Sequence, residues 1–380
     1  MENNNDNKVL NVPHLRFPEF TDEWKESVLS DFVERVKRKN KNNLCKLPLT
    51  ISAQYGLVDQ ISFFNKVIAS ENMSNYYLLH KGDFAYNKSY SSEYPWGAIK
   101  RLDCYEQGTL SSLYICFKPY SHVSSDFLTH YFETSKWHQG ISEIAVEGAR
   151  NHGLLNVGIQ DFFETRHCLP QSLLEQEKIA KFLNLIEERI ATQNKIIEKL
   201  QSLIKGLAVA LTTKEKANIA ISQCLECHSS TLQESEVLSS GLCKVFGANG
   251  LVGYKDVPQM NGDAILVIKD GSGVGTVSYA QGKFSVIGTL NYLTVIGNND
   301  LRYLYFALSV FNFQPYKTGM AIPHIYFKDY GKAKIYCPSL AEQKRVANVL
   351  DKLESKLFVE QELLASFNQQ KLYLLGKMFI

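Results

Sequence analysis

The sequence predicts an α+β protein with two tandem domains that contain mixed or curved sheets. Two long helices separate these domains and pack as an antiparallel coiled coil, with pseudo-two-fold symmetry. Three observations predict this fold. A long helical segment in the middle of the chain is repeated at its end, short glycine signatures before each helix are repeated too, and the segments between those glycines are β-branched or aromatic. A repeat of this size indicates two similar modules with similar roles.

The repeated helix is the clearest element. Residues 175–207 are followed at an offset of 167 residues by a second copy, residues 342–374. In both copies a proline, a serine (Ser172 or Ser339) and a Glu-Gln pair precede the apolar pattern, which is a typical helix start. The sequence therefore predicts two equivalent helices.

Apolar residues recur at alternating spacings of four and three along both helices, the pattern of a coiled-coil seam. At about 1.5 Å per residue, each seam is roughly 40 Å long. Two matching seams in one chain most simply pack on each other; the alternative is that each helix packs on its own domain. The predicted helix-pairing residues are Ile179, Leu183, Ile186, Ile190, Gln193, Ile197, Leu200, Ile204 and Leu207 in the first copy, and Val346, Leu350, Leu353, Leu357, Glu360, Leu364, Phe367, Lys371 and Leu374 in the second.

Gln193 and Glu360 are the polar midpoints of these two seams. If the helices pack antiparallel in full register, the two midpoints meet and form a central polar layer. Such a layer costs stability but can fix the register. The alternatives are that both side chains turn outward into solvent, or that the seams are offset by a turn.

The globular parts repeat more weakly. A Gly-Asp pair followed by an apolar run occurs at Gly82 and again at Gly262, and Gly97 and Gly275 each precede a further short apolar segment. These segments, bounded by Gly, Asn and Asp, predict short strands and turns. The predicted boundaries are 1–168 for the first domain (with 1–11 disordered), 169–212 for the central helix, 213–336 for the second domain, and 337–380 for the C-terminal helix.

Composition limits the possible classes of protein. No apolar run reaches the roughly 18 residues of a membrane span, and the Asn-rich start is not a signal peptide, so we expect a cytoplasmic protein. The net charge of +2 gives no overall electrostatic case for nucleic acid, and the densest basic run, residues 35–41, suits a phosphate contact or a solvated surface equally. The eight cysteines are expected to be free thiols. Cys224, Cys227 and His228 have haem-attachment spacing, but a second ligand pair is missing, so no metal site is predicted.

Motifs for catalysis are absent from the sequence. It contains no phosphate-binding G-x-x-x-x-G-K-[ST] loop, no G-x-S-x-G elbow, no H-E-x-x-H pair and no Pro-Pro-aromatic motif of amino-methylating enzymes. Two repeated modules without such motifs favour binding or scaffolding over catalysis, and no cofactor is expected on this chain.

These features resemble the specificity subunits of Type I restriction-modification systems over nearly the whole chain. The resemblance is carried by the opening segment 13–24, by the two helical segments that begin with proline and Glu-Gln, by the Gly-Asp signatures, and by the ending 374–379. It implies two target-recognition domains that read double-stranded DNA at a bipartite, asymmetric site. It also implies two methyltransferase subunits that carry S-adenosylmethionine, restriction subunits that carry ATP and Mg²⁺, and no membrane partner.

Base readout needs polar side chains on loops that enter a groove. Candidates are chosen by their place in the repeat, and for each one a solvated loop residue or local turn former is the alternative. Tyr90, Tyr94 and Trp96 could flank DNA or form core. The DNA-binding candidates are Asn87, Lys88, Ser89, Arg150, Asn151 and His152 in the first half, and Lys269, Asp270, Ser272, Asn291 and His324 in the second.

Two other functions are compatible with the sequence. A coiled-coil scaffold or adapter without DNA specificity would bind neither DNA nor a methyltransferase. A fused enzyme with an unrecognised active site, such as a nuclease, would be active as an isolated chain.

Overall fold

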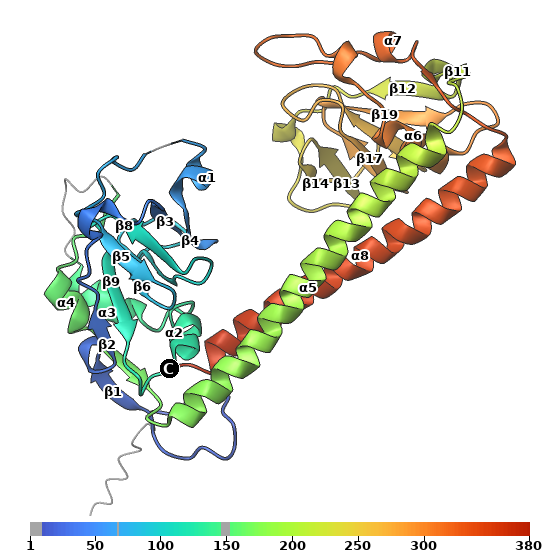
Figure 1. Ribbon diagram of the computed structural model, residues 1–380. Coiled ribbons are helices and arrows are strands. Elements are labelled where there is room, and N and C mark those ends of the chain that lie inside the picture. Colours follow the sequence, from blue (N-terminus) through green and yellow to red (C-terminus); the bar gives the residue numbers. More distant parts are fainter. Residues whose placement is uncertain (1–9, 67, 146–152) are drawn as a thin grey trace, which may run out of the picture. The chain divides into compact units, whose positions relative to one another are not determined.

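The computed structural model describes residues 10–66, 68–145 and 153–380 (Figure 1). Its contacts define two units. Unit 1 contains the chain up to Ala191 together with Ala365–Ile380, and unit 2 is Thr192–Leu364. The division falls inside both long helices, α5 (Leu173–Thr212) and α8 (Leu340–Lys377), so each unit contains one part of each helix.

Unit 1 is a mixed α and β structure. Its strands are β1 (Lys25–Val28), β2 (Val33–Arg35), β3 (Leu49–Ser52), β4 (Gly56–Asp59), β5 (Tyr77–His80), β6 (Phe84–Asn87), β7 (Ala98–Arg101), β8 (Gln107–Leu110), β9 (Ile115–Pro119) and β10 (Arg166–Leu169). Its short helices are α1 (Gln60–Phe64), α2 (Ser125–Tyr131), α3 (His138–Ile144) and α4 (Ile159–Phe163).

Unit 2 contains a similar set of elements. Its strands are β11 (Ile219–Ala220), β12 (Leu225–Ser229), β13 (Cys243–Gly247), β14 (Gly250–Lys255), β15 (Met260–Asn261), β16 (Ala264–Ile268), β17 (Val277–Ala280), β18 (Lys283–Val286), β19 (Leu290–Val295) and β20 (Lys334–Ile335). Its short helices are α6 (Leu301–Ser309) and α7 (Phe327–Tyr330).

The main sheets of the two units have the same topology, whereas the second sheet differs: unit 2 has the order β14-β13-β18-β15, and unit 1 has the separate pairs β3-β4 and β5-β8. The main sheet of unit 1 has the order β2-β9-β6-β7 and that of unit 2 has the order β12-β19-β16-β17, with antiparallel pairing throughout. In each unit a smaller antiparallel pair, β1-β10 or β11-β20, joins the start of the unit to the strand before a long helix. The predicted repeat of strands is therefore confirmed, and the predicted α+β class with it.

One strand boundary requires glycine because no other residue fits the backbone conformation there. Gly97 has a φ of +79°, and a Cβ added there would lie 2.2 Å from the carbonyl oxygen of Asn87. Strand β7 begins at the next residue, Ala98, and pairs with β6. Only glycine tolerates both the positive φ and this close approach.

The glutamine of the Glu-Gln pair at the start of each long helix has the same structural role in both units. Gln176 Nε2 donates to the carbonyl oxygen of Pro170 at 2.9 Å, and its Oε1 accepts from the backbone N–H of Ser124 at 2.8 Å. Gln343 makes the same two bonds, to Pro338 at 2.8 Å and from Asp300 at 2.8 Å. Ser124 and Asp300 are the N-caps of α2 and α6. Each glutamine therefore ties the start of a long helix to the start of the short helix packed beside it.

Within each unit α5 and α8 lie side by side and run antiparallel (Figure 1). In unit 1, Glu187 pairs with Lys371 at 2.8 Å. In unit 2, Gln193 Nε2 donates to the backbone oxygen of Glu360 at 2.9 Å and to its Oε2 at 2.5 Å. The structure thus places the two polar midpoints against each other, in the register that the central polar layer requires.

The seam residues are all buried or half-buried, whereas other apolar residues of the same helices, such as Leu185, Leu203 and Phe358, are exposed. The alternative prediction, that each long helix packs on its own domain, is also correct for part of each helix. Ile179 belongs to the core of unit 1 and Leu350 to the core of unit 2. The first turns of each helix therefore pack on a globular core, and the middle of each helix packs on the other helix.

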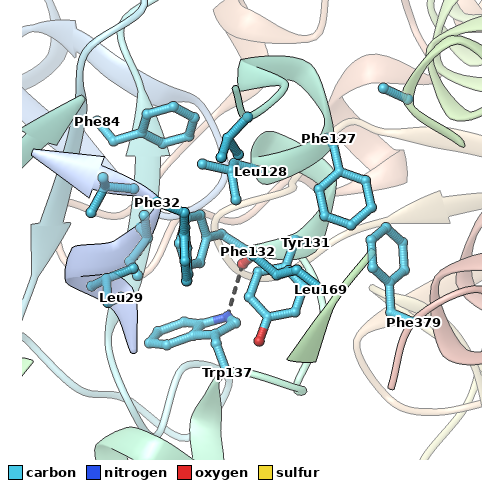
Figure 2. Close-up of a cluster of buried hydrophobic side chains, with 14 of the residues drawn as sticks. Leu29, Phe32, Phe84, Phe127, Leu128, Tyr131, Phe132, Trp137, Leu169 and Phe379 are labelled. Atoms are coloured by element: carbon cyan, nitrogen blue, oxygen red, sulfur yellow. Dashed lines mark hydrogen bonds between the residues drawn. The ribbon is translucent and has the colours of Figure 1, made fainter. Parts of the chain in front are cut away.

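The core of unit 1 includes the C-terminus of the chain. Phe379 lies against Phe127 and Tyr131, with ring centroids 5.3 Å and 6.1 Å away (Figure 2). In the same cluster the indole N–H of Trp137 donates to the backbone oxygen of Phe132 at 3.1 Å (Figure 2). Leu374, Leu375, Met378 and Phe379 are all buried. The last residues are therefore a structural part of the first half.

Candidate nucleic-acid interface

Three of the predicted candidates in unit 2 form one polar cluster. The carboxylate of Asp270 accepts from Lys269 Nζ at 2.6 Å through Oδ2, and its Oδ1 lies 2.7 Å from His324 Nδ1. All three side chains are partly exposed. Lys269 and Asp270 follow β16 directly, whereas His324 comes from a loop more than fifty residues later in the chain.

Backbone hydrogen bonds hold these two loops together. The N–H of Ile325 donates to the oxygen of Lys269 at 2.9 Å, and the N–H of Gly271 donates to the oxygen of Pro323 at 2.9 Å. Asp270 and His324 form an isolated antiparallel bridge. The backbone that carries these polar side chains is therefore held in place by hydrogen bonds between the two loops.

The cluster has a defined charge. Partial burial favours the neutral form of Asp270, but hydrogen bonds from Lys269 and His324 outweigh it and hold the pKa of this carboxyl below its usual range. Asp270 is therefore an anionic acceptor that orients the imidazole of His324. Among the described residues, His324 Nε2 has no hydrogen-bond partner, so the ring can present this nitrogen to a base edge.

Unit 1 brings the equivalent loops together. The N–H of Leu155 donates to the oxygen of Lys88 at 2.9 Å, the counterpart of the bond between Ile325 and Lys269. Ser89 forms a bridge with Leu154, and the N–H of Tyr90 donates to the oxygen of Gly153 at 3.1 Å. Arg150, Asn151 and His152, which the sequence also singles out, lie outside the described residues.

Two candidates have local structural roles. Asn291 lies on β19 with only 4% of its surface exposed, and its Oδ1 accepts from Ser229 Oγ at 3.0 Å. This burial overturns its selection as a base-reading residue, because its amide serves the strand pair β12-β19. Asn87 Oδ1 accepts from the backbone N–H of Ser89 at 3.0 Å, so Asn87 forms a local turn. Ser272, by contrast, is exposed beside the cluster of unit 2.

The basic run 35–41 serves the packing of unit 1. Arg38 pairs with the buried carboxylate of Asp83. Lys39 Nζ donates to the oxygen of Asn75 at 2.9 Å and lies 3.8 Å from the centre of the Tyr77 ring. These contacts favour a structural role for both side chains over a phosphate contact.

The cysteines and histidine at residues 224–228 have other surroundings than a shared ligand set. Cys224 is buried, and His228 Nε2 lies 2.9 Å from Thr294 Oγ1. All eight cysteines are free thiols. No group of three or more His, Cys, Asp or Glu side chains in the described ranges is placed to hold a metal ion. None of the described helices is both long and apolar enough to cross a membrane.

Comparison with known proteins identifies the fold. Residues 228–369 match the family model of the Type I restriction modification DNA specificity domain. This part of the chain is similar to the specificity subunits of Type I restriction-modification systems. A crystal structure of such an S subunit from M. genitalium has a TM-score of 0.62 and 17% identity, with 97% of this chain and 99% of that chain covered.

Two further relatives agree. A chain from a structure on complex assembly and conformational transition of the type I R-M system has a TM-score of 0.56 and 16% identity, and covers 94% of this chain and 97% of its own length. The Type I restriction enzyme EcoprrI specificity subunit of Escherichia coli is 24% identical over 110 residues. That alignment spans 29% of this chain and 27% of the relative. The predicted fold is therefore confirmed, and the resemblance stated from the sequence is supported by the match of residues 228–369 to the specificity-domain model.

The structure places the sequence candidates as follows. Lys88, Lys269, Asp270 and His324 were indicated by their place in the repeat, and each now lies where two loops meet. The rest of the loop that carries His324, residues 317–323, was not singled out from the sequence. Its signals were Gly319 and Pro323, which bound a turn.

Proposed function

We propose that this chain is the DNA-reading subunit of a Type I restriction-modification complex and that each unit reads one half of a bipartite, asymmetric site. The observation that carries the proposal concerns two equivalent loops in each unit. An equivalent backbone hydrogen bond joins these loops in both units, but the residues on the loops differ. Lys88 is followed by Ser89 and Tyr90, whereas Lys269 is followed by Asp270 and Gly271. Different side chains on equivalent loops predict different half-sites.

The partners would be two methyltransferase subunits and restriction subunits. Apolar side chains outside the seam, among them Phe358 and Val359, are more than half exposed on α8. Exposed apolar side chains that gather on one element are typical of interaction surfaces. The methyltransferases would bind S-adenosylmethionine and the restriction subunits ATP and Mg²⁺, while this chain would supply no catalytic group. Such a complex acts on DNA in the cytoplasm.

Co-expression with a Type I methyltransferase subunit, followed by mapping of methylated adenines, tests the proposal. The complex should methylate one asymmetric bipartite motif, and the isolated chain should methylate nothing. Asp270→Asn should change the preferred bases of one half-site only, by about tenfold or more for a contact of this kind. Asp256→Asn, which alters an exposed carboxylate elsewhere in unit 2, is the control and should leave the motif unchanged.

The other two functions predict different results. A scaffold without DNA specificity would leave methylation independent of this chain. A fused enzyme would cleave or modify DNA without any partner. Changes in both half-sites caused by Asp270→Asn would contradict independent reading by the two units.

A further inference from the structure

The loop at residues 317–326 is a stiff hairpin. The N–H of Thr318 donates to the oxygen of His324 at 2.9 Å, and the N–H of His324 donates to the oxygen of Thr318 at 2.7 Å. Gly319 has a φ of +87°, and an added Cβ would lie 2.3 Å from the oxygen of Ile322. Reciprocal bonds close the hairpin, and its turn requires glycine at position 319.

The base of this hairpin is fixed to the main sheet of unit 2. The bonds from Ile325 to Lys269 and from Gly271 to Pro323 attach it to the end of β16, and Ile325 itself is buried in the core. The hairpin therefore continues the framework that carries Asp270 and His324.

The tip of the hairpin is apolar. Met320 is fully exposed, Ile322 is 58% exposed, and Ala321 between them is exposed as well. Among the described residues, Met320 is the most exposed large hydrophobic side chain. Single exposed apolar residues are ordinary, but an apolar tip on a fixed hairpin next to a polar reading cluster is not explained by folding.

The surroundings of the hairpin indicate the kind of partner. Lys269 lies at its base and Lys317 is its first residue. Lys328 follows it, with its Nζ 5.3 Å from the centre of the exposed Tyr326 ring. Cations around a protruding tip complement a phosphate backbone. The major groove admits a two-stranded ribbon, and the apolar group that DNA offers there is the C5-methyl of thymine.

We propose that Met320 and Ile322 contact a thymine methyl in the major groove, within the half-site read by unit 2. This inference rests on the proposed function and adds an apolar reader beside the polar one. It requires at least one A·T pair in that half-site. The contact distinguishes thymine from uracil, which lacks only the methyl group.

The test uses the complex with the methyltransferase subunits and duplexes in which single thymines of the motif are replaced by deoxyuridine. For the unaltered complex, one replacement in the half-site of unit 2 should weaken binding about fourfold, the factor expected for burying one methyl group. The double variant Met320→Ala, Ile322→Ala should bind the thymine duplex more weakly by a similar factor and should no longer distinguish uracil from thymine. Replacements in the other half-site should have the same effect on variant and parent.

Leu242→Ala is the matched control, because Leu242 is 84% exposed in unit 2 but lies outside the hairpin. It should leave the discrimination intact, and both variants should melt at the temperature of the parent because the changed side chains are exposed. A half-site without an A·T pair would overturn the inference. So would a double variant that still discriminates, or a parent complex indifferent to every thymine methyl, as expected if the tip binds a protein or inserts between base pairs. If the parent complex has no sequence specificity at all, the proposed function fails first, and the inference falls with it.

Discussion

The Glu-Gln pairs at the two helix starts look equivalent in the sequence, but their glutamates lie in different environments. Glu175 has a side chain that is only 3% exposed. Its two oxygens accept from Arg16 Nε at 2.7 Å and Nη2 at 2.8 Å, and Oε1 also accepts from Trp24 Nε1 at 3.1 Å. The side chain of Glu342 is 33% exposed and pairs with the nearby Arg345. We therefore predict that Glu175→Ala is severely destabilising and Glu342→Ala is not.

The size of the effect follows from what the substitution leaves behind. Removing Glu175 leaves the guanidinium of Arg16, which is only 11% exposed, with its bond to the backbone oxygen of Asp22 but without its ion pair. The indole N–H of the buried Trp24 loses its acceptor as well. Breaking a buried ion pair in this way typically costs about 3–5 kcal/mol. Because Arg16 retains some contact with water, we take about 3 kcal/mol, or a fall in the Tm of unit 1 of roughly 6–12 °C for a domain of this size. Replacing both partners, with Arg16→Met and Glu175→Leu, should recover the part of this loss that comes from the unpaired guanidinium, while the Trp24 N–H stays without its acceptor.

Thermal denaturation combined with hydrogen exchange measures the prediction. The Tm of the first transition should fall for Glu175→Ala, and backbone amides of the segment 10–24 should exchange faster, because that segment depends on Glu175 for its attachment. Glu342→Ala should change neither quantity. Equal effects of the two alanine variants, or an unchanged segment 10–24 in Glu175→Ala, would refute the reasoning.

Two further predictions follow from the described contacts. Replacing both Gln193 and Glu360 with Leu should raise the Tm but loosen the register of α5 and α8, because it removes the polar layer. In a chain without native thiols, cysteines at 193 and 360 should cross-link within one molecule, and preferential linking a heptad away would show a different register. Burial lowers the pKa of His167 to about 4, below the usual 6.5, so this histidine is neutral in the folded protein and the unfolded chain takes up its proton first. The free energy of unfolding should therefore fall as the pH falls from about 6.5 to 4. Each unit of pKa shift corresponds to about 1.4 kcal/mol, so the total loss is up to about 3 kcal/mol. Urea denaturation across that range should show a flatter profile for His167→Gln than for the exposed-site control His122→Gln, and identical profiles would count against the assignment.

Local pattern was enough to predict the repeat, the two helices and the strands that follow the glycines. Each of these depends on residues that are near one another in the sequence, such as Gly97 before Ala98. The meeting of Gln193 and Glu360 was also predictable, since a repeated seam has a defined midpoint. All of these features depend on the spacing of residues along the chain, which can be read from the sequence.

The candidate interface was less predictable because its geometry depends on distant partners. The residues near Asn291 in the sequence do not show whether its amide is buried on a strand or exposed on a loop. The side chain that pairs with it, Ser229, is on another strand, far away in the sequence. The pairing of Asp270 with His324 likewise requires the bridge between two loops. Periodicity indicates which residues share an element, but it does not indicate which loops touch.

The C-terminus shows why two similar halves do not have equal requirements. In unit 1 the N–H of Leu15 donates to the oxygen of Lys377 at 2.9 Å, and the ring centroids of Trp24 and Phe379 are 6.4 Å apart. Both ends of the described chain therefore complete the core of unit 1. In unit 2 the end of α5 contributes to the core through Ala208, and Thr212 is buried as well. Glu175 holds the N-terminal segment of unit 1 through Arg16 and Trp24, whereas Glu342 lies nearer the surface and pairs with Arg345. The glutamines beside them kept one role, because the start of a short helix must be held in both units, with or without a chain end nearby.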